Sequence, residues 1–226
     1  VLKKKNYSTN VGDEGGFAPN LKSNEEAIII ILEAIEKAGY KPGKDIYIAL
    51  DPASSEYYIP KENMYHLHKS TGDKLTPGQM VDYWADWVKK YPIVSIEDPF
   101  EENAYSDFAD LRLLLKNKVQ VVGDDLTVTN VERVQAAITE NSANCLLLKV
   151  NQIGTVSEAM AAAALAQKAG WNVMVSHRSG ETSDTFIADL SVGIGSGQIK
   201  SGAPCRSERV AKYNRLLRIE EELNHK

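Results

Sequence analysis

The sequence predicts an α/β protein that folds as a (β/α)8-type, TIM-like barrel, with about six of the eight strands present. Two observations lead to this fold class. Short apolar strands alternate with capped helices, as in a parallel sheet, and after the first interval the strands recur roughly every 23 to 28 residues. No glycine-rich dinucleotide fingerprint follows the first strand, which disfavours a doubly wound sheet.

The composition indicates a globular protein with a sizeable core. Of 226 residues, 43% are hydrophobic and 25% are charged. A net charge of −5 argues against a nucleic-acid partner, and no apolar run is long enough to span a membrane. Two cysteines are too few for a disulfide framework. A buried free thiol at Cys145 is therefore expected, which favours a cytoplasmic location.

The strand count indicates that this is only part of a barrel. A closed barrel of this type needs eight strands, and the sequence supplies about six. The chain also begins at Val1 rather than at a methionine. We therefore expect residues 1–226 to be one partial barrel domain, with its first units upstream.

The first elements are a loop, a helix and a strand. Residues 1–22 are polar, and within them Val11–Asn20 places three glycines around two acids, so the backbone can approach a ligand closely. Ser23 starts a capping-box helix that ends at Gly39. The apolar strand that follows ends in the carboxylate of Asp51.

A hairpin insertion is predicted over residues 56–68, turning at Pro60–Asn63. His66 and His68 would share one face of its second strand, which is a spacing found in metal sites. Because no third partner is nearby, we interpret both as surface residues.

The remaining units repeat the order of helix and strand. Helices are expected after the N-caps Thr76, Thr129 and Thr155, over residues 107–116, between 182 and 197, and over 206–223. Strands are expected over residues 93–97, 119–124, 145–148, 171–176 and 197–200. The strand that ends on Lys149 is the most apolar, and burial would remove this ammonium from water, a setting in which a lysine can act as a base.

All six predicted strands deliver an ionisable group to the same end of the barrel. These groups are Asp51, Glu97, Asp124, Lys149, His177 and Lys200. The carboxyl ends of barrel strands converge on one mouth, where functional residues gather. Six successive strands that end in ionisable groups therefore predict a functional site at this end of the barrel, rather than an end that serves stability alone.

Three of these groups form an oxygen-only set. Asp51, Glu97 and Asp124 follow neighbouring strands, and repulsion among them would be costly without a cation. Hard divalent cations prefer carboxylate oxygens, whereas zinc would favour His or Cys. The sequence therefore predicts an Mg²⁺ site.

The other groups predict proton transfer beside a carboxylate. Lys149 would remove a proton next to a carboxylate, and Lys200 would help to hold the developing charge. The run His177–Ser179 offers a guanidinium, a hydroxyl and backbone N–H groups, which suit a phosphate. Glu14, in its glycine loop, is the candidate general acid. Together these roles describe an elimination of water.

Eight segments resemble the enolase (phosphopyruvate hydratase) family over about residues 10 to 224. They are Val11–Asn20, Ala49–Glu56, Ser95–Phe100, Asp124–Asn130, Leu146–Thr155, Val175–Thr182, Gln198–Pro204 and Arg206–Arg209. The resemblance implies a lyase of the enolase superfamily, with a lysine base and Mg²⁺ as in known members. It also implies a glycolytic, cytoplasmic homodimer or larger homo-oligomer.

The resemblance implies a role for each candidate residue. Asp51, Glu97 and Asp124 would hold Mg²⁺, and Lys149 would take the C2 proton of 2-phosphoglycerate, yielding phosphoenolpyruvate. Glu14 would assist departure of the C3 hydroxyl. The substrate would be bound by Lys200, His177, Arg178 and Ser179. Because the family's N-terminal domain and early barrel segments are not in this sequence, we expect residues 1–226 alone to be weakly active or inactive.

Two alternatives stay open. Another superfamily member would act on a different carboxylate, but such enzymes usually carry a Lys-x-Lys pair on an early strand, which is not seen here. A binding role is the other alternative. Enolases are also found at cell surfaces, where lysines bind plasminogen, and this sequence ends in Lys226.

Overall fold

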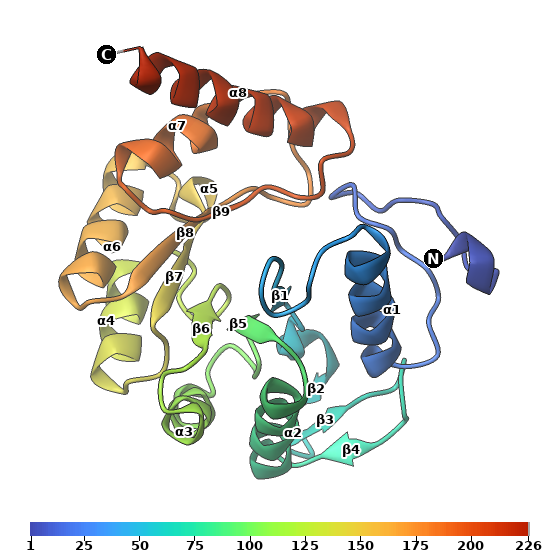
Figure 1. Cartoon of the computed structure of the whole chain (residues 1–226). Coiled ribbons are helices and arrows are strands. Elements are labelled where there is room, and N and C mark those ends of the chain that lie inside the picture. Colours follow the sequence, from blue (N-terminus) through green and yellow to red (C-terminus); the bar gives the residue numbers. More distant parts are fainter. Residues whose placement is uncertain (226) are drawn as a thin grey trace.

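The computed structural model describes residues 1–225 and contains a curled sheet of six parallel strands (Figure 1). The strands are β1 (Ile48–Leu50), β5 (Ile93–Glu97), β6 (Gln120–Gly123), β7 (Cys145–Leu148), β8 (Asn172–Ser176) and β9 (Ile199–Lys200), paired in that order. The sheet forms part of a barrel wall. The predicted fold class, an incomplete TIM-like barrel, is confirmed.

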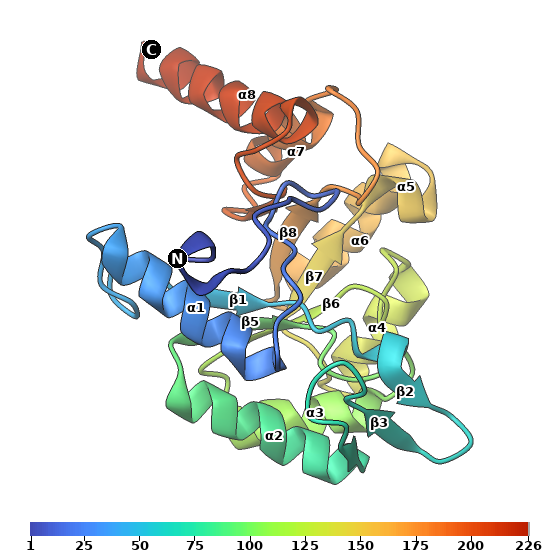
Figure 2. The ribbon, with the colours of Figure 1, turned by 90° about the vertical axis from the view of Figure 1, so that its right-hand side faces the viewer.

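Residues 1–225 form eight α-helices, most of which lie on the outer side of the curled sheet, as Figures 1 and 2 show; the shortest follows the end of β7 directly, and the last packs against the helix before it. They are α1 (Asn24–Lys37), α2 (Pro77–Lys90), α3 (Tyr105–Leu115), α4 (Val131–Thr139), α5 (Val150–Ile153), α6 (Val156–Lys168), α7 (Phe186–Gly193) and α8 (Ser207–Asn224). Two short 3-10 helices, η1 (Lys3–Lys5) and η2 (Ser54–Tyr57), lie in the connections. No helix within residues 1–225 combines the length and apolar character needed to cross a membrane.

Three of the predicted N-caps are confirmed. The side chains of Ser23 and Thr155 each accept a hydrogen bond from the backbone N–H three residues on. Thr76 forms a full capping box with Gln79. These bonds satisfy amides that a helix leaves unpaired in its first turn, so helix starts can be read from the sequence.

The N-cap predicted at Thr129 is wrong, and Asn130 caps α4 instead. Thr129 has φ 57°, which is left-handed and not the extended conformation of an N-cap. Its buried hydroxyl accepts a hydrogen bond from the backbone N–H of Lys149 at 3.0 Å and donates one to Gln152 at 3.0 Å. Thr129 therefore supports the end of β7 rather than the start of α4.

The hairpin is present but differs in detail from the prediction. Strands β2 (Tyr58–Ile59) and β3 (Met64–His66) pair in an antiparallel arrangement, and β4 (Lys74–Leu75) joins as an unpredicted third strand. Strand β4 was not predicted because its two residues are too few to show the alternation of apolar and polar side chains that marks a strand. The short helix α5, which begins at Val150 directly after Lys149, was also not predicted.

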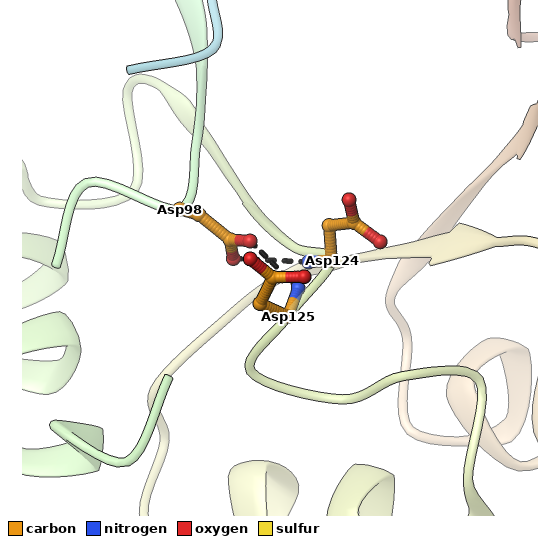
Figure 3. Close-up of side chains that lie close together, drawn as sticks. All are labelled: Asp98, Asp124 and Asp125. Atoms are coloured by element: carbon orange, nitrogen blue, oxygen red, sulfur yellow. Dashed lines mark hydrogen bonds between the residues drawn. The ribbon is translucent and has the colours of Figure 1, made fainter. Parts of the chain in front are cut away.

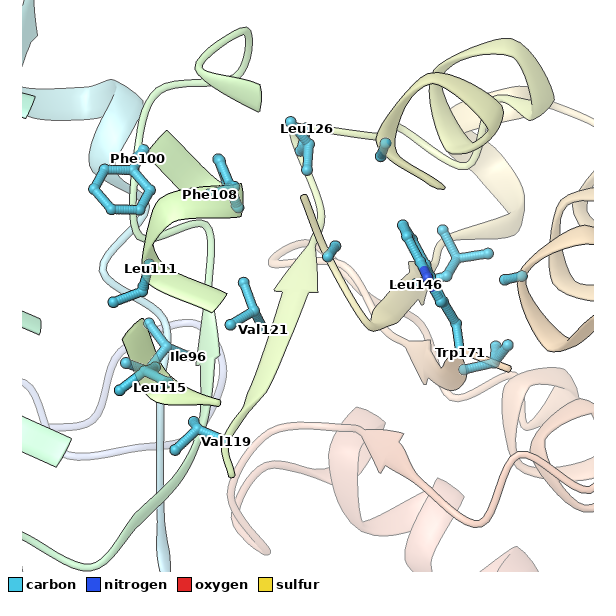
Figure 4. Packing of buried hydrophobic residues seen from close by; sticks show 14 of the residues in the cluster. Ile96, Phe100, Phe108, Leu111, Leu115, Val119, Val121, Leu126, Leu146 and Trp171 are labelled. Atoms are coloured by element: carbon cyan, nitrogen blue, oxygen red, sulfur yellow. The ribbon is translucent and has the colours of Figure 1, made fainter. Parts of the chain in front are cut away.

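The core lies between the sheet and the outer helices. Figure 4 shows Ile96 and Val121 of the sheet packed near Phe108 and Leu111 of α3, and all four are fully buried. Residues of β6 and β7 that point the other way, Val122, Cys145 and Leu147, are equally buried. Both faces of these strands are therefore packed, and Cys145 is the expected buried free thiol.

Candidate active site

Seven of the nine predicted site residues line one small cavity at the carboxyl ends of the strands. The cavity has a volume of about 130 Å³. It is lined by Glu14, Asp51, Lys149, Ser176, His177, Arg178, Ser179 and Lys200. The other two, Glu97 and Asp124, are hydrogen-bonded to its two lysines. The parallel sheet thus brings together groups that are distant in sequence.

Lys200 joins two of the three predicted metal ligands. Its Nζ lies 2.6 Å from Oδ2 of Asp51 and 2.8 Å from Oε1 of Glu97. Burial lowers the pKa of Lys200, but the two carboxylates outweigh burial and hold it above its usual value. Lys200 is therefore a fixed positive charge at the mouth.

Glu97 is the most buried of the predicted acids. Its side chain is 5% exposed. Burial and the nearby charge of Asp51 raise the pKa of Glu97 to about 8, and Lys200 opposes this shift. Asp124 adds a smaller repulsion. A carboxyl in this setting gains from any additional cation that shares its oxygens.

Lys149 pairs with the third predicted ligand, Asp124. The ammonium forms an ion pair with Oδ2, and the side chain of Gln152 donates a hydrogen bond to Oδ1 at 3.0 Å. Both members of the pair are largely buried, at 14% and 12% side-chain exposure. The strand end and helix α5, which carries Gln152, together orient this pair.

The closest acidic cluster differs from the predicted trio. One oxygen from each of Asp98, Asp124 and Asp125 lies within 4.8 Å of the others. Figure 3 shows Asp98 facing the backbone of the other two, while the Asp124 carboxylate turns away. The two oxygens of Asp98 accept from the N–H of Asp124 at 3.0 Å and of Asp125 at 2.6 Å. Asp98 therefore shapes the end of β6.

The sequence analysis did not single out Asp98, although it follows Glu97 directly. Burial raises the pKa of Asp98 to about 8, against the two backbone hydrogen bonds that lower it. The signal that could have found Asp98 is its position before Pro99, just past a strand end, where a short acidic side chain can accept backbone N–H groups.

The acidic groups fit a divalent cation. The donor set contains only carboxylate oxygens, and Asp51 and Glu97 already converge on one ammonium. Burial first and the charge of Asp51 second raise the pKa of Glu97, and Lys200 offsets only part of this shift. Asp51, Glu97 and Asp124 are the ligands expected from the sequence, whereas the carboxylate oxygens that lie within 4.8 Å of one another are those of Asp98, Asp124 and Asp125.

Glu14 is held at the mouth by its glycine loop. Its carbonyl accepts a hydrogen bond from the N–H of Ala203 at 2.9 Å. Gly15 has φ +82°, and a Cβ there would lie 2.5 Å from the carbonyl oxygen of Cys205. Only glycine suits this position, so the loop presses its backbone against the segment after β9 and points Glu14 to the cavity.

His177 faces Glu14 across the cavity. Its Nε2 lies 3.4 Å from Oε2 of Glu14, without hydrogen-bond geometry, and is a buried atom with no partner among the described residues. Burial lowers the pKa of His177, Glu14 opposes this, and Arg209 and Lys200 add to the lowering. The imidazole is therefore neutral at pH 7, with one nitrogen available to a ligand.

The loop after β8 carries the two other predicted binding residues. The backbone N–H of Arg178 donates to Glu181 at 3.0 Å, and its guanidinium donates to Asn151 at 2.9 Å. Ser179 is exposed at the mouth. These contacts hold the loop so that a guanidinium, a hydroxyl and the imidazole face the same cavity.

Two buried cations of α8 were missed by the sequence analysis. Arg209 and Lys212 are 0% and 1% exposed and bind the loops around the mouth. Their spacing of three residues places them on one face of the helix. Helical basic residues are usually solvent-exposed, so the sequence carries no signal that these two are buried.

The fold and the site define an α/β-barrel domain with acid, base and candidate metal-binding groups at the carboxyl ends of its strands. A family model described as "Enolase, C-terminal TIM barrel domain" matches residues 1–226, and the chain belongs to this family. The resemblance seen in the sequence is confirmed. Membership supports a lyase-type enzyme of the enolase superfamily with a small-molecule substrate, and it typically implies a divalent metal.

Proposed function

We propose that the protein containing this barrel catalyses the Mg²⁺-dependent dehydration of 2-phosphoglycerate to phosphoenolpyruvate. The observation that supports this most is the arrangement of the mouth. Lys149 and Lys200 lie on the acidic side, Glu14 and His177 lie across from each other, and all four line one cavity. Its volume of about 130 Å³ suits a small polar substrate.

The substrate would bind through charges at its two ends. Lys200, a fixed cation, would bind the substrate carboxylate, and Arg178 and Ser179 would bind the phosphate. His177 lines the cavity, and its Nε2 is buried without a hydrogen-bond partner, so it would donate to a substrate oxygen. Binding at both ends would orient C2 towards Lys149 and the C3 hydroxyl towards Glu14.

In the substrate, the reaction breaks the C2–H and C3–O bonds and forms the second bond between C2 and C3. Lys149 Nζ accepts the proton from C2, and the electron pair of that C–H bond becomes the C2–C3 double bond. The C3–O bond breaks, and Glu14 donates a proton so that the hydroxyl leaves as water. Mg²⁺ held by Asp51, Glu97 and Asp124 would stabilise the negative charge that develops on the substrate carboxylate.

One experiment tests the reaction. Formation of phosphoenolpyruvate and exchange of the C2 proton in D₂O would be followed by NMR, with a protein that carries the whole barrel and with residues 1–226 alone. The proposal expects both signals, dependent on Mg²⁺, in the whole barrel. No exchange and no product would contradict it. Near-full turnover by residues 1–226 would refute our expectation that this chain is weakly active.

A second experiment decides which of two sets of three acidic residues holds the metal: the predicted trio or the three-aspartate cluster. Glu97→Gln should weaken Mg²⁺ binding measured by calorimetry, whereas Asp125→Asn should leave it nearly unchanged. Asp125 lies in the three-aspartate cluster but not in the predicted trio, so it is the matched control. The opposite pattern would assign the metal to Asp98, Asp124 and Asp125.

The other expected properties are tested separately. A substrate panel separates 2-phosphoglycerate from the carboxylates of other superfamily members, and light scattering tests the proposed homodimer. The plasminogen alternative involves exposed lysines, among them Lys226, which lies outside the described residues; plasminogen binding that survives removal of Lys226 and of the other exposed lysines would count against it. We propose no second function.

A further inference from the structure

Arg209 is a fully buried cation at the first turn of α8. Its exposure is 0%, and its guanidinium makes four hydrogen bonds. Nη1 donates to Nδ1 of His177 at 2.7 Å and to the carbonyl of Arg178 at 2.7 Å. Nη2 donates to the carbonyl of Ser179 at 2.7 Å and to that of Asp13 at 3.0 Å.

The partners of Arg209 are neutral. The nearest acidic contact is Glu208, whose Oε1 lies 4.0 Å from the Nε of Arg209. A buried charge held by carbonyls rather than by a carboxylate is expensive, and an apolar side chain would usually serve stability better. The position of this guanidinium is therefore better explained by what it holds than by stability alone.

The bond to His177 selects one form of the imidazole. A guanidinium can only donate, so Nδ1 of His177 must accept. In a neutral ring the proton then resides on Nε2, the buried atom without a hydrogen-bond partner that lies 3.4 Å from Oε2 of Glu14. Of the charged groups around this ring, Arg209 and Lys200 oppose its protonation, and Glu14 and Glu181 favour it.

The remaining bonds connect two loops from opposite ends of the sequence. Asp13 precedes Glu14 in the glycine loop, and Arg178 and Ser179 lie in the loop after β8. One turn along α8, Lys212 donates to Glu181 at 2.8 Å and to the carbonyl of Thr182 at 2.6 Å. The same face of α8 therefore holds both walls of the cavity.

We infer that Arg209 is a positioning residue: it holds His177 as the neutral Nε2–H tautomer and fixes the Glu14 loop against the loop of Arg178 and Ser179. The effect of Arg209 on catalysis rests on the proposed dehydration. Its effect on the tautomer of His177 is independent of which reaction the protein catalyses. In this form His177 presents a hydrogen-bond donor to the ligand. Without Arg209, either nitrogen could carry the proton, and the imidazole would protonate more readily.

The first test uses ¹⁵N-histidine NMR of the intact chain between pH 6 and 8. The signals of His177 are assigned with the His177→Asn variant. The inference expects the neutral ring of wild-type His177 to be the Nε2–H tautomer. An Nδ1–H tautomer, or an imidazolium at pH 7, in the wild-type protein would overturn it, and this arm needs no folded Arg209 variant.

The second test removes the guanidinium. Arg209→Met should give mixed tautomers of His177 and raise its pKa, while Arg209→Lys, which keeps a charged donor, should restore part of the preference. Arg215→Met is the control, because Arg215 lies on α8 but pairs with Asp189 and Glu222. An unchanged tautomer in folded Arg209→Met would overturn the inference.

The third test measures activity in a protein with the whole barrel. Arg209→Lys should lower kcat by about tenfold to a hundredfold, the usual effect of losing a group that orients a functional residue, and change KM less. The acid limb of its pH profile should move upward. If kcat and the pH profile of Arg209→Lys were unchanged, Arg209 would have no role in catalysis. No wild-type turnover would refute the proposed function, while NMR would still decide the tautomer.

Discussion

Lys200, on the last strand of the sheet, donates a hydrogen bond to Asp51, which directly follows the first strand. Their Nζ and Oδ2 atoms lie 2.6 Å apart across 149 residues of sequence. Strands β9 and β1 are at opposite ends of the strand order and do not pair. Curling of the sheet therefore brings its two outer strand ends together at the mouth.

This relationship predicts that Lys200→Met destabilises the chain more at pH 8 than at pH 5. Because the pKa of Glu97 is raised to about 8 from a usual 4.5, its native form binds more protons than its unfolded form between these values. Stability from this group therefore falls as pH rises. Loss of the ammonium adds to the repulsion between Glu97 and Asp51 as both ionise.

Urea unfolding at the two pH values measures the effect of Lys200→Met. The control is Lys74→Met, since Lys74 pairs with Glu62 on the exposed small sheet. A surface pair is worth about 0–1 kcal/mol, so the control should change little at either pH. Equal losses for Lys200→Met at pH 5 and pH 8 would contradict the prediction.

Gly15→Ala should displace the Glu14 loop. A Cβ at residue 15 would lie 2.5 Å from a backbone carbonyl, and φ +82° is strained for alanine. Gly16→Ala is the matched control, because nothing lies within 4 Å of a Cβ at that position. We expect at least a tenfold loss of turnover in a whole-barrel protein for Gly15→Ala only. Similar activity of the two variants would show that the loop tolerates the shift.

The contribution of His177 to the stability of the chain should fall as pH drops below about 6.5. Its folded pKa is lowered from 6.5, so the unfolded state binds more protons in this range and stability is lost on acidification. One proton gives a slope of up to about 1.4 kcal/mol per pH unit. His177→Asn should remove this contribution, so its free energy of unfolding should depend on pH differently from that of wild type, as measured by denaturant unfolding between pH 5 and 7.

The control for His177 is His68→Asn, which changes an exposed imidazole on the hairpin segment. This variant should keep the wild-type slope. If His177→Asn showed the same pH dependence as wild type, His177 would make no such contribution to stability.

Lys149→Ala should abolish exchange of the C2 proton of 2-phosphoglycerate while Mg²⁺ binding persists. The variant removes the proposed base but leaves Asp124 bonded to Gln152. NMR in D₂O measures exchange, and calorimetry measures metal binding. Lys168→Ala, at the exposed end of α6, is the control. Continued exchange at the normal rate would exclude Lys149 as the base.

The sequence was sufficient to locate the strand ends and most helix starts, because both depend on local patterns. Apolar runs such as Cys145–Leu148 predict a buried strand, and Ser23, Thr76 and Thr155 satisfy amides within their own helices. Once the strands are known to be parallel, their carboxyl ends must share one edge. The candidate site residues therefore follow from topology.

The pairings within the mouth could not be predicted in this way. Which acid each lysine meets depends on the curl of the sheet: Lys200 reaches Asp51 and Glu97, whereas Lys149 reaches Asp124. The cap at Asn130 also depended on a non-local constraint, since Thr129 is held under β7. Such contacts join residues far apart in sequence and leave no periodic signal.

The contacts of α8 also imply an order of assembly during synthesis. Glu14, Lys149 and the loop of Arg178 all leave the ribosome before Arg209 and Lys212, which bind the two loops around the mouth. The strands can therefore pair while the loops at their ends are still without these bonds. The catalytic geometry would form only when the first turns of α8 emerge and dock, so binding competence should appear late in translation, after most of the sheet has folded.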